Sequence, residues 1–338
     1  MKNVIGIGSA LVDILTRIDN DNILKELDIR KGSMHLVDEK STSIIEKRLE
    51  NYESSMAPGG SAANTIHALS KMGIESGFIS FIGKDEIGKF FENSMSSVGV
   101  KSYLFHSDTA SGTARTIISA DGERTFATNL GASLELNERV ITSDIFKQWN
   151  YCYVEGYLIA NKPVFVKTIS TAKACGCKVV LDLASFNVVE ENRDFLNELL
   201  PQIDIIFANE EEAKALTLMS AEESLHYIAE KVKIAVVKVG KNGSLIKRGN
   251  EVVQIGCNKI DVVDTTGAGD MYAAGFLYGL INDYDLESCG IIGNHLAESI
   301  IQVIGSSLDH CLLFEIFTEC NAGNSAITVG NFVIFGQL

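Results

Sequence analysis

The chain has 338 residues, which is enough for one large α/β domain with a substantial buried core. It carries 44 acidic and 29 basic residues, and its net charge of −15 has no local basic cluster to offset it, so we expect no nucleic-acid partner. The apolar runs are shorter than the roughly 20 residues that a membrane span needs. We therefore expect no membrane partner. Seven cysteines without framework spacing indicate reduced thiols, so we expect a cytoplasmic protein.

Short β-branched runs alternate with helix-length segments along the chain. Strands are expected at 4–7, 77–81, 151–154, 179–183, 203–207 and 234–239, and helices at 61–72, 87–98, 164–175 and 221–231. This alternation predicts an α/β fold: β-α-β units that form a mostly parallel sheet flanked by helices, a three-layer core. Ligands of such sheets bind beyond the carboxyl ends of the strands.

Two regions interrupt this alternation. Residues 113–128 contain two strand-like arms around Asp121 and Gly122, which is a strong hairpin signal. Residues 34–37 and 103–106 are also extended in character. We therefore predict a small antiparallel β-sheet, built from about residues 14–37 and 103–130 and inserted in a core of residues 1–310. Such a sheet can close over a substrate as a lid and exclude water.

The first glycine-rich segment contains Gly6 and Gly8, which superficially match a dinucleotide-binding loop. Position 11 is Leu where that motif needs its third glycine, so a dinucleotide site is disfavoured. Asp13 lies just past a buried strand, where its carboxylate can accept hydrogen bonds from two neighbouring hydroxyls. An ordinary loop acid is the alternative.

A second glycine segment, Gly59 and Gly60, opens the helix expected from residue 61. Two glycines let the backbone approach a ligand closely, and Asn64 lies one helical turn further on, where its amide can face the same ligand. The alternative is a simple glycine turn with Ser61 as the helix cap.

Two later segments have polar residues at the ends of apolar strands. Asn209 and Glu212 are three apart and share a face if a helix begins there, so their oxygens can organise Mg²⁺ directly or through its waters. A solvated acidic helix start is the alternative. Lys238 precedes two glycines, Gly240 and Gly243, which form either a nucleotide-contacting turn or a plain hairpin.

The segment from Asp264 to Asp270, Asp-Thr-Thr-Gly-Ala-Gly-Asp, places a glycine turn, a helix start and a carboxylate side by side. Free backbone N–H groups at a helix start attract a phosphate. Asp270 can accept a proton next to that phosphate, and phosphoryl transfer to a hydroxyl needs this combination. The alternative is that Asp270 is only a helix N-cap.

Taken together and in this order, these motifs resemble those of the ribokinase-like, or PfkB-type, carbohydrate and nucleoside kinases. The resemblance extends from Val4 to about Gly305, and residues 264–270 are its most specific part. It implies an ATP-dependent phosphotransferase that uses Mg²⁺ and acts on a small-molecule sugar or nucleoside. Whether a monovalent cation such as K⁺ assists near Asp264 is left open.

The resemblance also implies a role for each matching position. Asp270 corresponds to the general base, and Gly267, Ala268 and Gly269 correspond to the anion hole. The positions that bind the hydroxyls of the acceptor correspond to Asp13, Gly59, Gly60 and Asn64. Asn209 and Glu212 correspond to the magnesium-associated pair. The nucleotide is expected at Asn209, Lys238, Gly240, Gly243, Thr266 and Asn294.

Within this family, residues 121–132 are similar to the lid segment of the adenosine-kinase-like branch. A nucleoside base needs an apolar slot, and Met34, Leu36 and Tyr157 are candidates to line it. Ser9 stands where that branch has an Asn, so a ribose- or fructose-type sugar kinase is the alternative. Two other classes of protein fit less well. A hydride-transferring oxidoreductase leaves the segment 264–270 without a role, and a non-catalytic nucleotide-sensing protein leaves Asp270 without one.

The last stretch, residues 311–338, departs from the family. It is apolar, with Glu315 and Glu319 as its formally charged residues. Exposed apolar segments usually mark an interface, so we expect this tail to pair with a second subunit in a homodimer or to cover a sheet edge.

Overall fold

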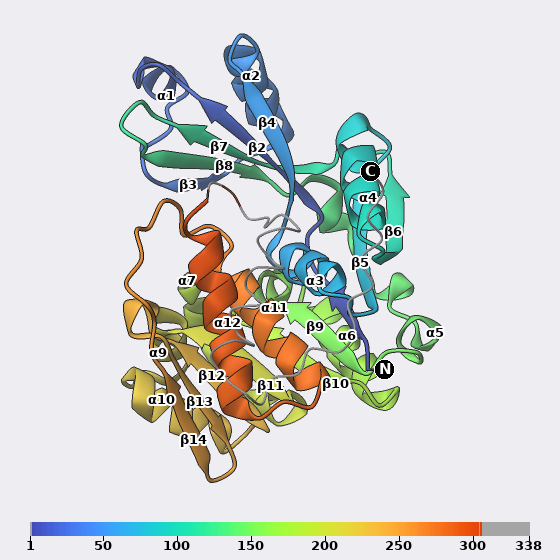
Figure 1. Ribbon diagram of the computed structural model, residues 1–338. Coiled ribbons are helices and arrows are strands. Elements are labelled where there is room, and N and C mark those ends of the chain that lie inside the picture. The colour runs from blue at the N-terminus through green and yellow to red at the C-terminus, as the bar shows by residue number, and fades with distance from the viewer. Residues whose placement is uncertain (1, 304, 306–338) are drawn as a thin grey trace, which may run out of the picture.

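The computed structural model describes residues 2–303 and 305, and it contains two separate β-sheets (Figure 1). The large sheet has nine strands in the order β14-β13-β12-β11-β10-β9-β1-β5-β6, and the small sheet has five in the order β3-β8-β7-β2-β4. Helices cover both faces of the large sheet. The predicted α/β fold with a second, smaller sheet is therefore confirmed.

The large sheet is mostly parallel. Its strands are β1 Val4–Ile7, β5 Ser76–Gly83, β6 Lys101–Ser107, β9 Tyr151–Glu155, β10 Lys178–Asp182, β11 Ile205–Asn209, β12 Ile234–Lys238, β13 Ser244–Arg248 and β14 Glu251–Ile255. Only β13 and β14 run antiparallel to their neighbours, at one edge. The central strands β1 and β9 are buried at every position, as a sheet covered on both faces requires. All six strands predicted in this region are present, with ends shifted by up to two residues.

Two helical layers enclose this sheet. One layer contains α3 Ser61–Lys71, α4 Glu86–Ser97, α11 Ala268–Ile281 and α12 Leu286–Ile300. The other contains α5 Ser143–Phe146, α6 Lys162–Ala174, α7 Phe186–Glu191, α8 Arg193–Leu199, α9 Glu210–Thr217 and α10 Ala221–Ala229. Each layer packs its apolar side chains on one face of the sheet. No helix in the described ranges is both long and apolar enough to cross a membrane.

The small sheet stands off this core, with two helices on its outer side (Figure 1). It consists of β2 Leu11–Arg17, β3 Met34–Leu36, β4 Ser54–Gly59, β7 Gly112–Ile118 and β8 Arg124–Asn129, and the helices are α1 Asn22–Glu26 and α2 Glu39–Leu49. The hairpin predicted around Asp121 and Gly122 is present as the antiparallel pair β7–β8. The sheet is nevertheless mixed rather than antiparallel, because β2 runs parallel to β7 and β3 runs parallel to β8.

The prediction that residues 103–106 belong to the small sheet is wrong. They lie in β6, which pairs in parallel with β5 at the edge of the large sheet. Phe105 stacks on Phe81 with ring centroids 5.3 Å apart, and Tyr103 meets Trp149 edge to face at 6.5 Å. An extended apolar run predicts a strand but carries no information about which sheet it joins. The predicted tail at 311–338 lies outside the described residues.

Helices α11 and α12 lie side by side (Figure 1) and approach each other closely at Gly275. A Cβ atom added at Gly275 would lie 2.7 Å from the carbonyl oxygen of Ile292 and 2.9 Å from Cα of Gly293. The close approach therefore depends on the missing side chain. Because α11 also carries Asp270 in its first turn, this contact helps to set the position of that carboxylate.

We predict that Gly275→Ala destabilises the protein. Alanine is up to ~1 kcal/mol better than glycine in a helix interior, but overpacking against backbone atoms costs about 1–3 kcal/mol. We expect a lower urea midpoint and melting temperature. The control Ser96→Ala changes an exposed position of helix α4 and should leave both unchanged. A Gly275→Ala variant at least as stable as the wild type would contradict the close approach.

Candidate active site

A cavity of about 1030 Å³ opens at the carboxyl edge of the large sheet. Asp182, Asn209 and Lys238, which end the adjacent strands β10, β11 and β12, all line it. The first turn of α11 lines the same cavity with Gly267, Ala268, Gly269 and Asp270. The cavity therefore lies where parallel α/β sheets bind ligands.

The glycine segment forms a helix start that faces this cavity. Gly267 is the N-cap of α11 and adopts a left-handed conformation, with φ of 77°. A Cβ atom added at Gly269 would lie 3.1 Å from Lys238 Nζ, so the ammonium group lies against the first turn of the helix. The free N–H groups and the ammonium together form a cradle for an anion. The alternative that Asp270 is the N-cap is wrong, because Gly267 holds that position.

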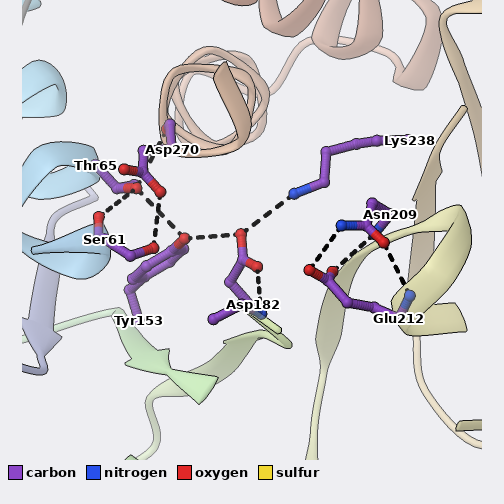
Figure 2. Close-up of polar contacts among 9 residues, drawn as sticks. Ser61, Thr65, Tyr153, Asp182, Asn209, Glu212, Lys238 and Asp270 are labelled. Atoms are coloured by element: carbon purple, nitrogen blue, oxygen red, sulfur yellow. Dashed lines mark hydrogen bonds and ion pairs between the residues drawn. The ribbon is translucent and has the colours of Figure 1, made fainter. Parts of the chain in front are cut away.

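Asp270 links α11 to α3. The Ser61 hydroxyl donates to Asp270 Oδ1 at 2.7 Å, and Asn64 Nδ2 donates to Oδ2 at 2.9 Å. Figure 2 shows Ser61 and Thr65 directly opposite Asp270. The alternative that Ser61 caps α3 is also wrong, since Gly60 is the N-cap and makes no side-chain cap bond. Asn64, Ser61 and Asp270 thus form one hydrogen-bonded cluster.

Burial raises the pKa of Asp270 to about 6, although the hydrogen bonds from Asn64 and Ser61 lower it. The helix dipole alone predicts a lowered pKa and a weak base. Removal of the carboxyl group from water is the larger effect here. An aspartate with this pKa is ionised at neutral pH and is a stronger proton acceptor than an exposed one.

A buried polar chain connects Asp182 to both sides of the cavity (Figure 2). The Tyr153 hydroxyl donates to Asp182 Oδ2 at 3.2 Å, and Lys238 Nζ lies 3.5 Å from the same oxygen. Burial alone would lower the pKa of Lys238, but attraction to Asp182, Glu212 and Asp270 outweighs it and raises that pKa. Lys238 therefore stays a cation at the centre of the site.

Asn209 and Glu212 form a capping box at the start of α9. The Asn209 backbone N–H donates to Glu212 Oε2 and the Asn209 Nδ2 to Oε1, both at 2.8 Å. Glu212 is buried, and that burial raises its pKa to about 7, so it is not a solvated helix start. The described residues contain no cluster of three acidic, histidine or cysteine ligands for a metal. A hydrated Mg²⁺ held partly by phosphate oxygens fits these carboxyl oxygens better than a fully protein-ligated ion.

The two glycines at 59 and 60 allow close contact with the first loop. A Cβ atom added at Gly59 would lie 2.3 Å from Asp13 Oδ1, and one at Gly60 would lie 2.2 Å from the Ser9 carbonyl oxygen. Gly60 also has a φ of 97°, which side chains rarely adopt. The Asp13 carboxylate is thus seated against the chain that leads into α3 and the Asp270 cluster.

Met34 and Leu36 are 55% and 69% exposed on strand β3. Strand register places both on the same face of the small sheet as Asp13 and Phe126, which is the face opposite to α1 and α2. Tyr157 is 41% exposed and lines the cavity itself.

Four other predicted positions belong to the cavity or its supports. Gly240 and Gly243 line it from the β12–β13 hairpin, so the segment is a hairpin, and its contact with a nucleotide stays a prediction. Asn294 lines it as well, and its Nδ2 donates to the Gly256 carbonyl at 2.8 Å. Thr266 donates its backbone N–H to Asp264 Oδ1 at 3.0 Å and supports the turn, while its neighbour Thr265 lines the cavity.

Sequence reasoning missed two acids of the site, Asp182 and Glu155. Glu155 is buried at the end of β9, accepts from the backbone N–H of Ala62 at 3.1 Å and of Ser9 at 3.3 Å, and has a pKa raised by burial to about 7. A signal was available in the sequence. Asp182 is the next-to-last residue of the strand predicted at 179–183, and Glu155 directly follows the strand predicted at 151–154. An acid at that place points to the ligand edge of the sheet.

A third missed residue, Arg124 of β8, forms an ion pair with Asp264 of the glycine segment. Asp264 also accepts backbone bonds from Thr266 and, at 2.7 Å, from Gly305. Burial would raise the pKa of Asp264, but these three partners outweigh it and lower that pKa. Nothing in the local sequence around Arg124 or Asp264 indicates their contact. The monovalent cation near Asp264 stays a prediction.

Known proteins are similar to this chain in sequence and in fold. The family model described as pfkB family carbohydrate kinase matches residues 35–310. The chain is 23% identical to adenosine kinase 2 of Arabidopsis thaliana, over 89% of this chain and 94% of that one. It is 28% identical to a 5-dehydro-2-deoxygluconokinase of Bacillus licheniformis, over 84% and 92%. The crystal structure of adenosine kinase from Sinorhizobium meliloti superimposes with a TM-score of 0.82 at 32% identity, over 93% and 98%.

The fold and the site together define a phosphotransferase of the α/β class, with ATP as the donor expected for such enzymes. The chain belongs to the pfkB family of carbohydrate kinases, since the family model covers most of its length. Its relatives include both nucleoside and sugar kinases, so family membership supports a sugar or nucleoside as the acceptor class.

Proposed function

We propose that the protein transfers the γ-phosphoryl group of ATP to the hydroxymethyl group of a ribonucleoside, adenosine or a close relative, with Asp270 as general base. The observation that carries this proposal is the position of Asp270 between the two halves of the site. It lies in the first turn of α11 on the cavity, and it is bonded to Ser61 and Asn64 of α3, which begins where Asp13 contacts Gly59.

In this reaction, the acceptor hydroxyl lies next to Asp270 and gives its proton to a carboxylate oxygen. The hydroxyl oxygen forms a bond to the γ-phosphorus, and the bond from that phosphorus to the β–γ bridging oxygen breaks, so that ADP leaves. The N–H groups at the start of α11 and the Lys238 ammonium stabilise the negative charge on the transferred group. Asn209 and Glu212 would hold a hydrated Mg²⁺, which supplies further charge neutralisation to the phosphates.

The side chains on one face of the small sheet support a nucleoside as acceptor. The face that carries Asp13 also carries Met34, Leu36 and Phe126, with the two β3 side chains exposed. A carboxylate suits two ribose hydroxyls, and the apolar side chains suit a flat base. A furanose alone has no apolar body of that size. The second candidate, a sugar kinase, is favoured by the similarity to the 5-dehydro-2-deoxygluconokinase.

Activity on a panel of acceptors tests the general base and the acceptor together. We expect ATP consumption to be stimulated most by adenosine or a related ribonucleoside in a panel that includes ribose and fructose. Asp270→Asn should lower the rate by roughly 10²–10⁴-fold, because it cannot accept the proton. Leu36→Gln should raise KM for the nucleoside, while Ile44→Gln, exposed on α2, should not. Preference for a free sugar, with Leu36→Gln unchanged, would support the sugar kinase instead.

The pKa of Asp270 sets the expected pH dependence of the reaction. Asp270 must be ionised to accept a proton, and its pKa of about 6 means that kcat/KM falls as the pH drops below 6. The decline should approach about tenfold per pH unit. Glu155 and Glu212 titrate at about 7, so the profile should be repeated with Glu155→Gln and Glu212→Gln. The decline near pH 6 should persist in both, and its absence would remove Asp270 as the base.

The Mg²⁺ requirement of the enzyme tests the role of Glu212. Glu212→Gln should raise the Mg²⁺ concentration needed for half-maximal activity by roughly tenfold, because a neutral amide orders the hydrated ion less well. The matched control is Glu223→Gln, which changes the same position of the capping box at the start of α10, on the exposed surface. An equal Mg²⁺ requirement in both variants would show that Glu212 acts only as a helix cap.

A further inference from the structure

Asp182 is a buried acid in the middle of the site, and the proposed phosphoryl transfer does not use it. Its side chain is 4% exposed and lies between Tyr153 and Lys238 (Figure 2). Its Oδ1 accepts from the backbone N–H of Ala184 at 3.1 Å. Its Oδ2 accepts from the Tyr153 hydroxyl at 3.2 Å and lies 3.5 Å from Lys238 Nζ. A carboxylate this deeply buried needs such partners to compensate its charge.

Two of these partners fix the orientation of the Asp182 carboxylate. Tyr153 is buried, and burial raises its pKa well above the usual range, so its hydroxyl keeps the proton that it donates. Thr65 Oγ1 lies 3.3 Å from that hydroxyl and 3.2 Å from the carbonyl oxygen of Asp270, which ties the tyrosine to the first turn of α11. Ala184 has a φ of 62°, in the left-handed region that side chains rarely adopt, and this conformation directs its N–H at Asp182.

The Lys238 ammonium interacts with three carboxylates and forms its ion pair with one of them. Burial would lower the pKa of Lys238, and attraction to Asp182 is the largest of the effects that raise it, ahead of Glu212 and Asp270. The ion pair is with Asp182, whereas Asp270 accepts hydrogen bonds from α3. A cation paired directly with Asp270 would lower the pKa of that carboxyl group and weaken it as a base.

We propose that Asp182 is a positioning residue that retains the Lys238 ammonium on the nucleotide side of the cavity and keeps it from pairing with Asp270. This inference rests on the proposed kinase reaction for its catalytic consequence. With Lys238 retained, its charge lies against Gly269 in the anion cradle, and the Asp270 carboxylate is available for the proton of the acceptor. Without Asp182, the ammonium moves to Asp270, so that the base weakens and the cradle loses its cation together.

Other titratable groups also face Asp270, and they stay unchanged when Asp182 is replaced. Glu155 of β9 and Tyr157, two residues further on, both interact electrostatically with Asp270. Burial raises the pKa of Glu155 to about 7 and that of Tyr157 to about 12. Glu155 can therefore add a step to a pH profile near neutrality, and each comparison below is repeated with Glu155→Gln.

The test compares Asp182→Asn in the wild type and in a Lys238→Gln background. In the wild type, the decline of kcat/KM at low pH should move down by about one pH unit, because a paired cation lowers the pKa of Asp270. KM for ATP should rise roughly tenfold, as loss of a charged contact predicts. Removal of the Asp182 charge also lowers the pKa of Asp270 directly. The shift should be much smaller with Lys238→Gln, which has no ammonium to move, and an equal shift in both backgrounds would overturn the proposal.

Two tyrosines of β9 provide a matched pair for the hydrogen bond to Asp182. Tyr153→Phe removes the hydroxyl that orients the carboxylate, so KM for ATP should rise and the low-pH decline should move in the same direction as in Asp182→Asn. Tyr151 is equally buried on the same face of the strand, but its hydroxyl meets Lys178 Nζ at 3.3 Å, at the amino ends of the strands. Tyr151→Phe should leave both quantities unchanged. Equal effects in the two variants would show that the loss of any buried hydroxyl is responsible, against the proposal.

Carbon-13 NMR of labelled aspartate carboxyl groups gives a readout that needs no turnover. The Asp270 signal is identified by its loss in Asp270→Asn. The pKa of Asp270 should fall by about one unit in Asp182→Asn and stay unchanged in Tyr151→Phe. An unchanged or higher pKa in Asp182→Asn would overturn the proposal even if the rate fell. If instead Asp270→Asn were as active as the wild type while the pKa responded as expected, the proposed reaction would fail and the retention of Lys238 would stand.

Discussion

The structure of the site depends on one constraint: the Asp270 carboxyl group is partly buried and held between two helices that come from distant parts of the chain. Ser61 and Asn64 of α3 satisfy its two oxygens, and this fixes α3 against the first turn of α11. The surrounding packing serves the same geometry. Gly275 lets α12 hold α11 closely, and Gly59 and Gly60 let the acceptor loop approach the start of α3.

A second constraint is charge balance at the carboxyl edge of the sheet. The Lys238 ammonium lies among Asp182, Glu212 and Asp270 and is attracted to all three. Burial nevertheless raises the pKa of Glu212 to about 7 and that of Asp270 to about 6. The site is therefore suited to a ligand that arrives with a cation, as a magnesium-bound nucleotide does, and Lys238 keeps enough positive charge at the helix start to attract its phosphates.

The sequence predicted the elements with strong local signals and missed the contacts that only the tertiary fold creates. The β-branched runs, the hairpin at Asp121 and the glycine turn before Asp270 depend on neighbouring residues, and all were found. The sheet that β6 joins, the bond from Ser61 to Asp270 and the pair of Arg124 with Asp264 link residues far apart in the chain. The raised pKa of Asp270 was missed for the same reason, since burial is a property of the assembled fold.

Under the proposed function, the two sheets would bind different substrates. The nucleotide would bind at the strand ends of the large sheet and at α11, where Lys238, Gly267 and Asp270 line the cavity. The acceptor would bind largely against the small sheet, where β3 has Met34 and Leu36 exposed on the face of Asp13. Substitutions on that face change what fits against Asp13 without disturbing the buried network around Asp270. The chain is similar to both an adenosine kinase and a 5-dehydro-2-deoxygluconokinase. If the proposed acceptor site is correct, the exposed side chains of β3 are where acceptor choice would change first.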